Sequence, residues 1–232
     1  MNLLLTNDDG IDAPGLAALR TVAQRLTEGR VVVVAPAGPM SECSHCVSTR
    51  EPIRVERRGE SEIAVHGSPA DCVRLALTTD VCGDFRPDWV LSGINAGGNL
   101  GVDIYYSGTV AAAREAAMFG IPAMAISHYL RRGLDVDWDV AGARAERELG
   151  KLLAEPVGPQ EFWNVNLPHL DPGFPEPEVV RCDPSRRPLP VRFAEEQDGL
   201  RYNGVYSERE HETGSDVAEC FAGRISISKL RV

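Results

Sequence analysis

The sequence predicts an α/β fold, a Rossmann-like and mostly parallel sheet with helices on both faces, followed by a C-terminal appendage rich in β-hairpin. Three observations lead to this prediction. Short apolar runs at 3–6, 30–36 and 89–92 have the continuous hydrophobicity of strands that are buried on both faces. Segments with apolar residues at helical spacing lie between these runs, which is the pattern of strand–helix–strand units. Prolines become frequent after residue 155, where the helical pattern fades.

The first part of the chain is expected to form a βαβ unit. A strand at 3–6 precedes a helix that begins near Pro14, a residue suited to a first helical turn, and ends before Gly29. The valine run within 30–36 then forms the second strand. The elements expected next are a loop at 37–50, a hairpin of strands 52–55 and 62–65 around 57–60, and a helix at 69–79.

The second part repeats the alternation of strands and helices. The expected elements are a strand at 89–92, a Gly- and Asn-rich loop at 93–101, an Ala-rich helix at 109–119, a strand at 121–127 and a helix at 138–154. We therefore assign 1–155 to the Rossmann-like catalytic core. We assign 156–232 to a Pro-rich extension with an oligomerisation hairpin at 186–206, turning at Asp198-Gly199, and a returning strand at 225–230.

Composition narrows the function classes. The 232 residues are 43% hydrophobic and 25% charged, which is typical of a globular protein. The formal net charge of −10 argues against a nucleic-acid binder, which needs a basic surface. No apolar run is long enough for a membrane span, and the N-terminus has no signal-peptide pattern. We expect a cytoplasmic protein with reduced cysteines.

The first candidate site segment is Asn7-Asp8-Asp9-Gly10, directly after the first strand. Two adjacent carboxylates at a buried strand end repel each other, and burial increases the cost. A hard divalent cation, which prefers oxygen ligands, would remove this repulsion. An ordinary turn is the alternative, since Asn, Asp and Gly are common turn residues.

The second candidate segment is the loop at 37–49. Ser41, Ser44 and Ser48 carry hydroxyls that suit a metal or a phosphate, and His45 can donate a hydrogen bond or a proton. A polar surface loop is the alternative. Cys43 and Cys46 have the CxxC spacing, but the sequence offers no second CxxC for a zinc site, and a redox role stays open.

The third candidate segment, 92–109, is the most informative. Its density of glycines lets the backbone approach a ligand closely, and Asn95 and Asn99 add neutral polar groups. Ser107-Gly108-Thr109 then opens the Ala-rich helix, whose first N–H groups and positive dipole end suit an anion. A helix cap with a flexible linker is the alternative. Together the three segments predict metal-assisted phosphoester hydrolysis.

These residues, taken jointly, resemble the signature of the SurE family of 5′/3′-nucleotidases. The motifs that carry the resemblance are Asn7-Asp8-Asp9-Gly10 with Ala13-Pro14-Gly15, Val34-Ala35-Pro36 with Ser41, Gly67 to Cys72, Ser92 to Gly101, and Tyr106 to Ala113. The match is dense over 1–127 and patchy beyond. It departs from the family at 37–40, which usually holds an acidic and basic run, and at Glu42, where a small residue is common.

The resemblance implies a Rossmann-like core and one divalent ion per subunit, Mg²⁺ or Mn²⁺. It also implies hydrolysis of nucleoside 5′- and 3′-monophosphates, with short polyphosphate as a substrate of some members. The metal ligands it implies are Asp8, Asp9, Ser41 and Asn95. Our own hypothesis for the catalytic step is that Asp8 or Asp9 orients the attacking water or takes its proton. The substrate-binding residues it implies are Ser44, His45, Asn99, Ser107, Gly108 and Thr109. The expected assembly is a homodimer or homotetramer.

Three other functions stay open at this point. Aspartyl-phosphate chemistry favours an Asp-x-Asp spacing, which Asp8-Asp9 lacks. A nucleoside hydrolase would also use an Asp cluster, in that case to cleave a glycosidic bond. A nucleotide-binding or sensor protein would bind the same ligand without turnover.

Overall fold

The computed structural model describes residues 1–41 and 43–232. Glu42, one of the departures from the family pattern, lies outside the described residues. Within them, the main sheet has nine strands in the order β3-β4-β2-β1-β5-β6-β7-β11-β8. These strands are β1 (Leu3–Thr6), β2 (Val31–Pro36), β3 (Val55–Gly59), β4 (Glu62–Val65), β5 (Trp89–Ala96), β6 (Ala123–His128), β7 (Glu161–Leu167), β8 (Val179–Arg181) and β11 (Ile225–Arg231).

The centre of this sheet is parallel. The six strands from β4 to β7 run in one direction, while β3 at one edge and the β11–β8 pair at the other run against them. Parallel strands need crossover connections, and helices supply them here. The α/β class and the mostly parallel sheet predicted from the sequence are confirmed.

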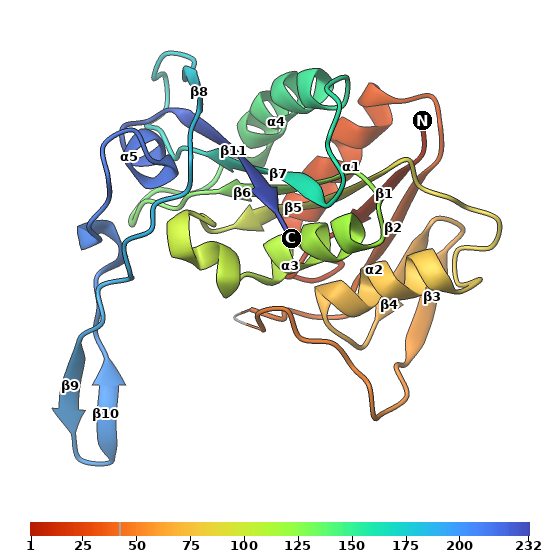
Figure 1. Ribbon diagram of the computed structural model, residues 1–232, viewed down its shortest axis with the longest axis horizontal. Coiled ribbons are helices and arrows are strands. Elements are labelled where there is room, and N and C mark those ends of the chain that lie inside the picture. Colours follow the sequence, from red (N-terminus) through yellow and green to blue (C-terminus); the bar gives the residue numbers. More distant parts are fainter. Residues whose placement is uncertain (42) are drawn as a thin grey trace.

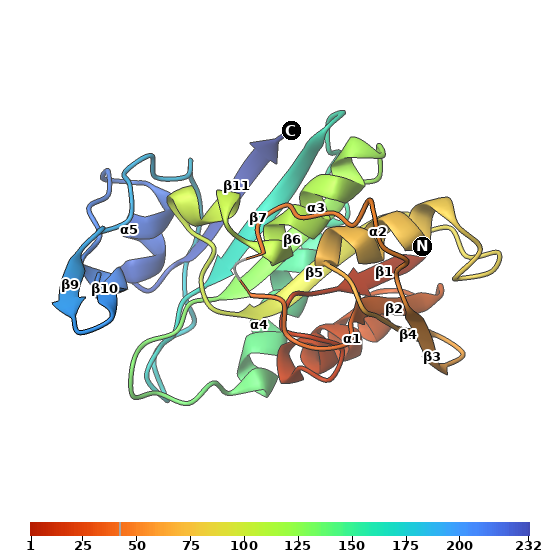
Figure 2. The same cartoon turned by 90° about the horizontal axis from the view of Figure 1, so that it is seen from below.

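Helices cover both faces of the sheet, as Figure 2 shows. The helices are α1 (Pro14–Leu26), α2 (Pro69–Thr78), α3 (Gly108–Met118), α4 (Trp138–Leu152) and the short α5 (Asp216–Phe221), with 3₁₀ turns η1 (Gly101–Tyr105) and η2 (Tyr206–Glu208). Helices α1 and α4 pack on one face, and α2 and α3 on the other. Leu3 and Leu5 belong to the first of these cores and Leu4 to the second, which explains why β1 is apolar throughout.

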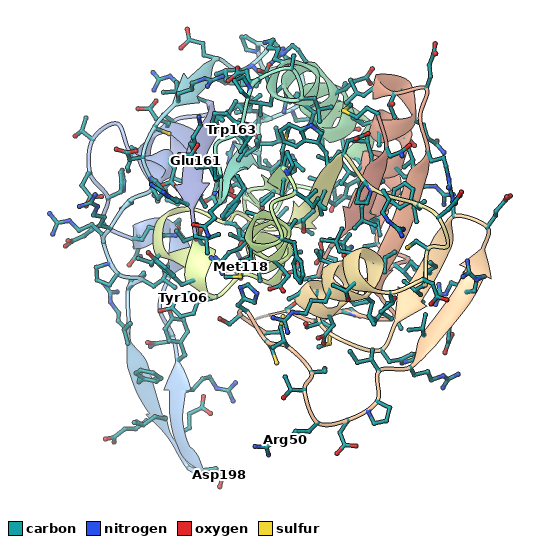
Figure 3. The ribbon with its side chains drawn as sticks, turned by 45° about the vertical axis from the view of Figure 1, so that its right-hand side comes forward. Arg50, Tyr106, Met118, Glu161, Trp163 and Asp198 are labelled. Carbon is teal, nitrogen blue, oxygen red and sulfur yellow. The ribbon has the colours of Figure 1, made fainter. Side chains whose placement is uncertain are left out.

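Beyond β7 the chain leaves the centre of the sheet and returns to its edge through β8 and β11. A separate two-stranded hairpin, β9 (Phe193–Glu196) and β10 (Gly199–Tyr202), projects from the body (Figure 1), with Asp198 at its tip (Figure 3). Helix α5 packs near β11, where the chain rejoins the main sheet. Over residues 1–41 and 43–232, no helix is both long and apolar enough for a membrane crossing.

Three expected elements have other bounds in the structure, and β7, β8 and α5 were not predicted. The first strand of the N-terminal hairpin is β3, so 57–59 belong to a strand and the turn follows them. Strand β5 continues through Ala96, into the segment predicted as loop. The strands of the projecting hairpin cover only 193–202 rather than 186–206, and the flanks keep one backbone hydrogen bond, from the Asn203 N–H to the Arg192 carbonyl. Strand β7 was missed, since its buried Asn164 and Asn166 interrupt the apolar pattern.

The division into domains at residue 155 stays a prediction. Strands β7, β8 and β11 all come from beyond it, yet they complete the main sheet. The segment 156–232 therefore contributes both the projecting hairpin and three strands of the main sheet.

Candidate active site at the carboxyl edge of the sheet

The three candidate segments meet at the carboxyl ends of the parallel strands. Thr6 of β1 pairs with Ser92 of β5, so the segments that follow both strands emerge side by side. The backbone N–H of Met40, in the loop after β2, donates to the Asp8 carbonyl oxygen at 2.7 Å. Ligands of open α/β sheets bind at this edge.

Asp8 is buried and lies against the start of α3. Only 6% of the residue is exposed, and the Thr109 hydroxyl donates a hydrogen bond to its Oδ1. The pKa of Asp8 is raised from 3.8 to about 6, mainly by burial; the Thr109 hydrogen bond opposes this rise, and the neighbouring charge of Asp9 adds to it. An ionised Asp8 is therefore costly here unless a cation accompanies it.

Gly108 allows this close approach. A Cβ at this position would lie 2.9 Å from the Asp8 Cβ and 3.0 Å from the Cys43 Sγ. No real Cβ fits at such a distance from the backbone-anchored atoms of Asp8. The helix start can thus contact the carboxylate only because residue 108 has no side chain.

Asp9 has a more open environment. Its Oδ2 accepts a hydrogen bond from the backbone N–H of Ala96, at the end of β5, at 2.9 Å. It lines a cavity of about 380 Å³ together with Ala96 and Trp138. The two carboxylates therefore differ, since Asp8 is covered by α3 whereas Asp9 faces a space that water can enter.

Oxygen atoms from three elements are available for a divalent ion. The Asn95 amide nitrogen donates to the Gly97 carbonyl at 2.7 Å, which leaves the side-chain oxygen as the atom with ligand chemistry. Ser41 is exposed and follows Met40, which is bonded to Asp8. No group of three His, Cys, Asp or Glu side chains that could hold a metal occurs in the described part of the chain. An ion here would therefore need neutral oxygens beside the two carboxylates, and this donor set suits Mg²⁺ or Mn²⁺.

The start of α3 has the features of an anion site. The Ser107 hydroxyl caps the helix by accepting from the Val110 N–H at 3.0 Å. The N–H groups of Gly108 and Thr109 belong to the first turn, where no acceptor exists within the helix. They lie at the positive end of the helix dipole beside Asp8, whose pKa a backbone hydrogen bond from Thr109 helps to lower.

Ser44 and His45 connect the loop after β2 to this helix. The Ser44 hydroxyl donates to the Tyr105 carbonyl at 2.7 Å, and its N–H donates to the Tyr106 carbonyl at 3.0 Å. Tyr106 lies where η1 leads into α3 (Figure 3). The His45 Nε2 lies 2.6 Å from the Glu115 Oε2. The loop is thus fixed against the phosphate-binding candidates by both residues.

Asn99 has partners within the protein. Its amide nitrogen donates to the Ser127 hydroxyl at 2.7 Å, and its backbone N–H donates to the Asn166 Oδ1 at 2.8 Å. Its carbonyl oxygen accepts from the amide nitrogens of Asn164 and Asn166 at 2.9 and 3.1 Å. This buried network shapes the loop, and a role of Asn99 in phosphate binding stays a prediction.

Sequence reasoning missed Glu115, which is 1% exposed on α3 and pairs with both His45 and Arg74. The available signal was a charged pair, Arg114-Glu115, within an otherwise small and apolar helix. It missed Asn164 and Asn166 because β7 itself was missed. Such residues position the candidate site without belonging to any of its motifs.

Fold and site together define a Rossmann-like α/β protein with a carboxylate pair beside a helix start at one sheet edge. The family described as Survival protein SurE matches residues 3–186, and the chain belongs to this family.

Individual proteins agree with this assignment. A protein from Nostoc sp., provisionally named a 5′-nucleotidase, is 51% identical over 232 residues, which cover 100% of both chains. The 5′-nucleotidase SurE of Methylocella silvestris is 39% identical over 241 residues, covering 100% of this chain and 94% of its own. The crystal structure of the SurE protein from Aquifex aeolicus superposes with a TM-score of 0.83 at 33% identity, covering 100% of this chain and 93% of that one.

Proposed function

We propose that this chain is a metal-dependent phosphomonoesterase that hydrolyses nucleoside 5′- and 3′-monophosphates to nucleoside and phosphate. The names of its relatives as 5′-nucleotidases support the activity. The observation that carries the proposal is the contact between Asp8 and Thr109, because it joins the carboxylate pair to the anion-binding helix start. Short polyphosphate is a further substrate to test.

The residues that would hold one Mg²⁺ or Mn²⁺ ion are Asp8, Asp9, Ser41 and Asn95. The raised pKa of Asp8 supports this set, since a cation would relieve the cost of its buried charge. When bound, such an ion supplies charge neutralisation at the phosphoryl oxygens and makes water more acidic.

The phosphoryl group would be held by the start of α3. The first-turn N–H groups of Gly108 and Thr109 would donate to its oxygens, and charge that develops there would meet the positive helix end. Ser107 fixes this turn through its cap. Ser44 and His45, in the loop after β2, would border the phosphoryl group. Asn99 would contact it or hold the loop after β5 in place.

One of the two carboxylates would accept the proton of the attacking water. Asp9 is only partly buried, unlike Asp8, so we assign to it the role of orienting an attacking water and accepting its proton. Asp8 is covered by Thr109 and Gly108, so it would hold the ion and align the reacting groups.

The projecting hairpin supports a homodimer or homotetramer. Its large apolar side chains Phe193, Leu200 and Tyr202 are all exposed in the single chain. Two such faces would cover each other on assembly. Light scattering of the purified chain, compared with a chain lacking 193–202, would give the subunit number and the hairpin's part in it.

The test is phosphate release from a panel of phosphomonoesters. AMP, GMP, 3′-AMP, tripolyphosphate and p-nitrophenyl phosphate would each be assayed with Mg²⁺, with Mn²⁺ and after chelation. We expect metal-dependent release with a preference for nucleotides. Free base from adenosine would instead indicate a nucleoside hydrolase. A trapped phospho-Asp8 would indicate aspartyl-phosphate chemistry, and AMP binding without turnover would indicate a sensor.

A further inference from the structure

The chain that follows the projecting hairpin packs against the loop that leads to the phosphate-binding candidates. Arg209, three residues after Tyr206 at the start of η2, has a side chain with 0% exposure. Its Nη1 donates to the Asp103 Oδ2 at 2.7 Å, and its Nη2 donates to the Leu100 carbonyl at 3.2 Å. The Tyr206 hydroxyl donates to the same Asp103 oxygen, and the Arg209 guanidinium lies over the Tyr206 ring, 4.9 Å from its centroid.

The backbone of Asp103 is hydrogen-bonded to the residues that open α3. Its carbonyl oxygen accepts from the Tyr106 N–H at 2.9 Å and from the Ser107 N–H at 3.0 Å. Ser107 is the cap of α3, and the next two residues carry the N–H groups proposed for phosphate. Asp103 thus links the C-terminal segment to the helix start, because its side chain bonds Arg209 and its backbone bonds Ser107.

A second contact fixes the same turn. The Gly101 N–H donates to the Asp216 Oδ2 at 2.7 Å, and the Ser185 N–H donates to the Asp216 Oδ1 at 2.8 Å. Gly101 has a φ of +54°, and a Cβ there would lie 2.9 Å from the Ser185 carbonyl and 3.0 Å from the Arg209 Nη2. The C-terminal segment therefore closes on η1 with no room for a side chain at this position.

A role in stability alone would not require this arrangement. Burying an ion pair has a large desolvation cost, and well-packed apolar residues of the same volume often stabilise a fold equally well. A buried guanidinium that donates from Nη1 to the Asp103 carboxylate and from Nη2 to the Leu100 carbonyl instead fixes the relative position of these two partners. The pair of Arg192, directly before the hairpin, and Glu208, after it, is exposed, with 63% and 53% of the side chains exposed. It imposes no such geometry and offers a control.

We infer that Arg209 and Asp103 are positioning residues, whose buried pair holds the start of α3 in the place where it binds the phosphoryl group. This inference rests on the proposed function. Neither residue needs to touch the substrate. A small displacement of a positioning contact can cost one to two orders of magnitude in rate, because the reacting groups lose their alignment.

The test compares Arg209→Met, which keeps much of the volume but loses the charge and the donors, with Arg192→Met as the control. Both would be assayed well below their melting temperatures for kcat and KM with AMP. The inhibition constant of inorganic phosphate, which reports on the phosphate site itself, would be measured in parallel. We expect Arg209→Met to lower kcat/KM by about tenfold to a hundredfold and to raise the phosphate inhibition constant, while Arg192→Met stays within about twofold.

Two further variants keep the test decisive if Arg209→Met does not fold. Asp103→Asn preserves shape and one acceptor, and Arg209→Lys preserves charge but cannot donate to Asp103 and Leu100 together. We expect intermediate losses of kcat/KM with both. The inference is overturned if folded variants have a lower melting temperature but unchanged kinetic constants and phosphate inhibition. A parent chain without activity toward AMP would overturn the proposed function instead, and calorimetric binding of inorganic phosphate to the same variants would still decide this inference.

Discussion

Replacing Asp8 by Asn should stabilise the metal-free protein at neutral pH, although it removes a proposed metal ligand. Burial raises the pKa of Asp8 from 3.8 to about 6. The folded state therefore binds more protons than the unfolded state between these values. The stabilising contribution of the protonated carboxyl is fully present below pH 3.8 and is lost as the pH rises through about 6.

The size of the effect follows from this shift. A difference of about 2 pKa units corresponds to about 3 kcal/mol of stability lost above the folded pKa. Asn avoids that loss and can still accept from Thr109, but its amide nitrogen needs an acceptor, which costs about 1–2 kcal/mol. We expect Asp8→Asn to be less stable than the parent by about 1 kcal/mol near pH 4 and more stable by about 1–2 kcal/mol near pH 8.

Urea unfolding in the presence of a chelator, repeated between pH 4 and 8, measures this difference. Asp198→Asn, the same substitution at the exposed hairpin tip, is the matched control. Added Mn²⁺ should reverse the order at pH 8 by stabilising the parent more than the variant. A difference between parent and Asp8→Asn that is constant over this pH range would refute the reasoning.

Three other changes probe the contacts around Asp8. Thr109→Val keeps the shape of the side chain but removes the hydrogen-bond donor to Asp8. Turnover of AMP should fall by about tenfold or more, consistent with the loss of about 1.5–3 kcal/mol from a charged hydrogen bond. An unchanged rate would show that this contact has no part in catalysis. Gly108→Ala puts a Cβ 2.9 Å from the Asp8 Cβ, so Asp8 or the helix start must shift, and both the melting temperature and the metal affinity measured by calorimetry should drop. An unchanged metal affinity in the folded variant would contradict this role of Gly108. Replacing both Cys43 and Cys46 by Ser should leave activity unchanged under reducing conditions. It should protect activity against a disulfide-forming oxidant, because Cys43 lies close to Gly108. Equal sensitivity of parent and variant to the oxidant would exclude a redox role.

The sequence predicted the parallel core because its strands are buried on both faces and therefore uniformly apolar. The prediction missed β7, because this strand is also buried but is not uniformly apolar. Asn164 and Asn166 lie in a buried strand, where polar side chains are tolerated because they hydrogen-bond the Asn99 carbonyl. A local pattern cannot reveal such residues, since their partner is more than 60 residues away in the chain.

The candidate site was predictable as far as it lies in local motifs. The carboxylate pair and the helix start were both identified from short segments, and the structure brings Asp8 and Thr109 into contact. The supporting residues were not, because their roles depend on pairs distant in sequence. Arg209 and Asp103 are 106 residues apart, and no pattern around either one indicates a buried ion pair. Glu115 likewise has a role only through His45 and Arg74, which come from other elements.

The central claim is that a divalent cation held by Asp8 and Asp9 beside the start of α3 drives phosphoester hydrolysis. The most direct measurement is phosphate release from AMP by the chelated protein as Mn²⁺ is added back in known amounts. We expect no release without metal, and a rise in rate that levels off at one equivalent per chain in the parent and is absent in Asp9→Asn. Full activity in the chelated protein, or a parental response to Mn²⁺ in Asp9→Asn, would contradict the account.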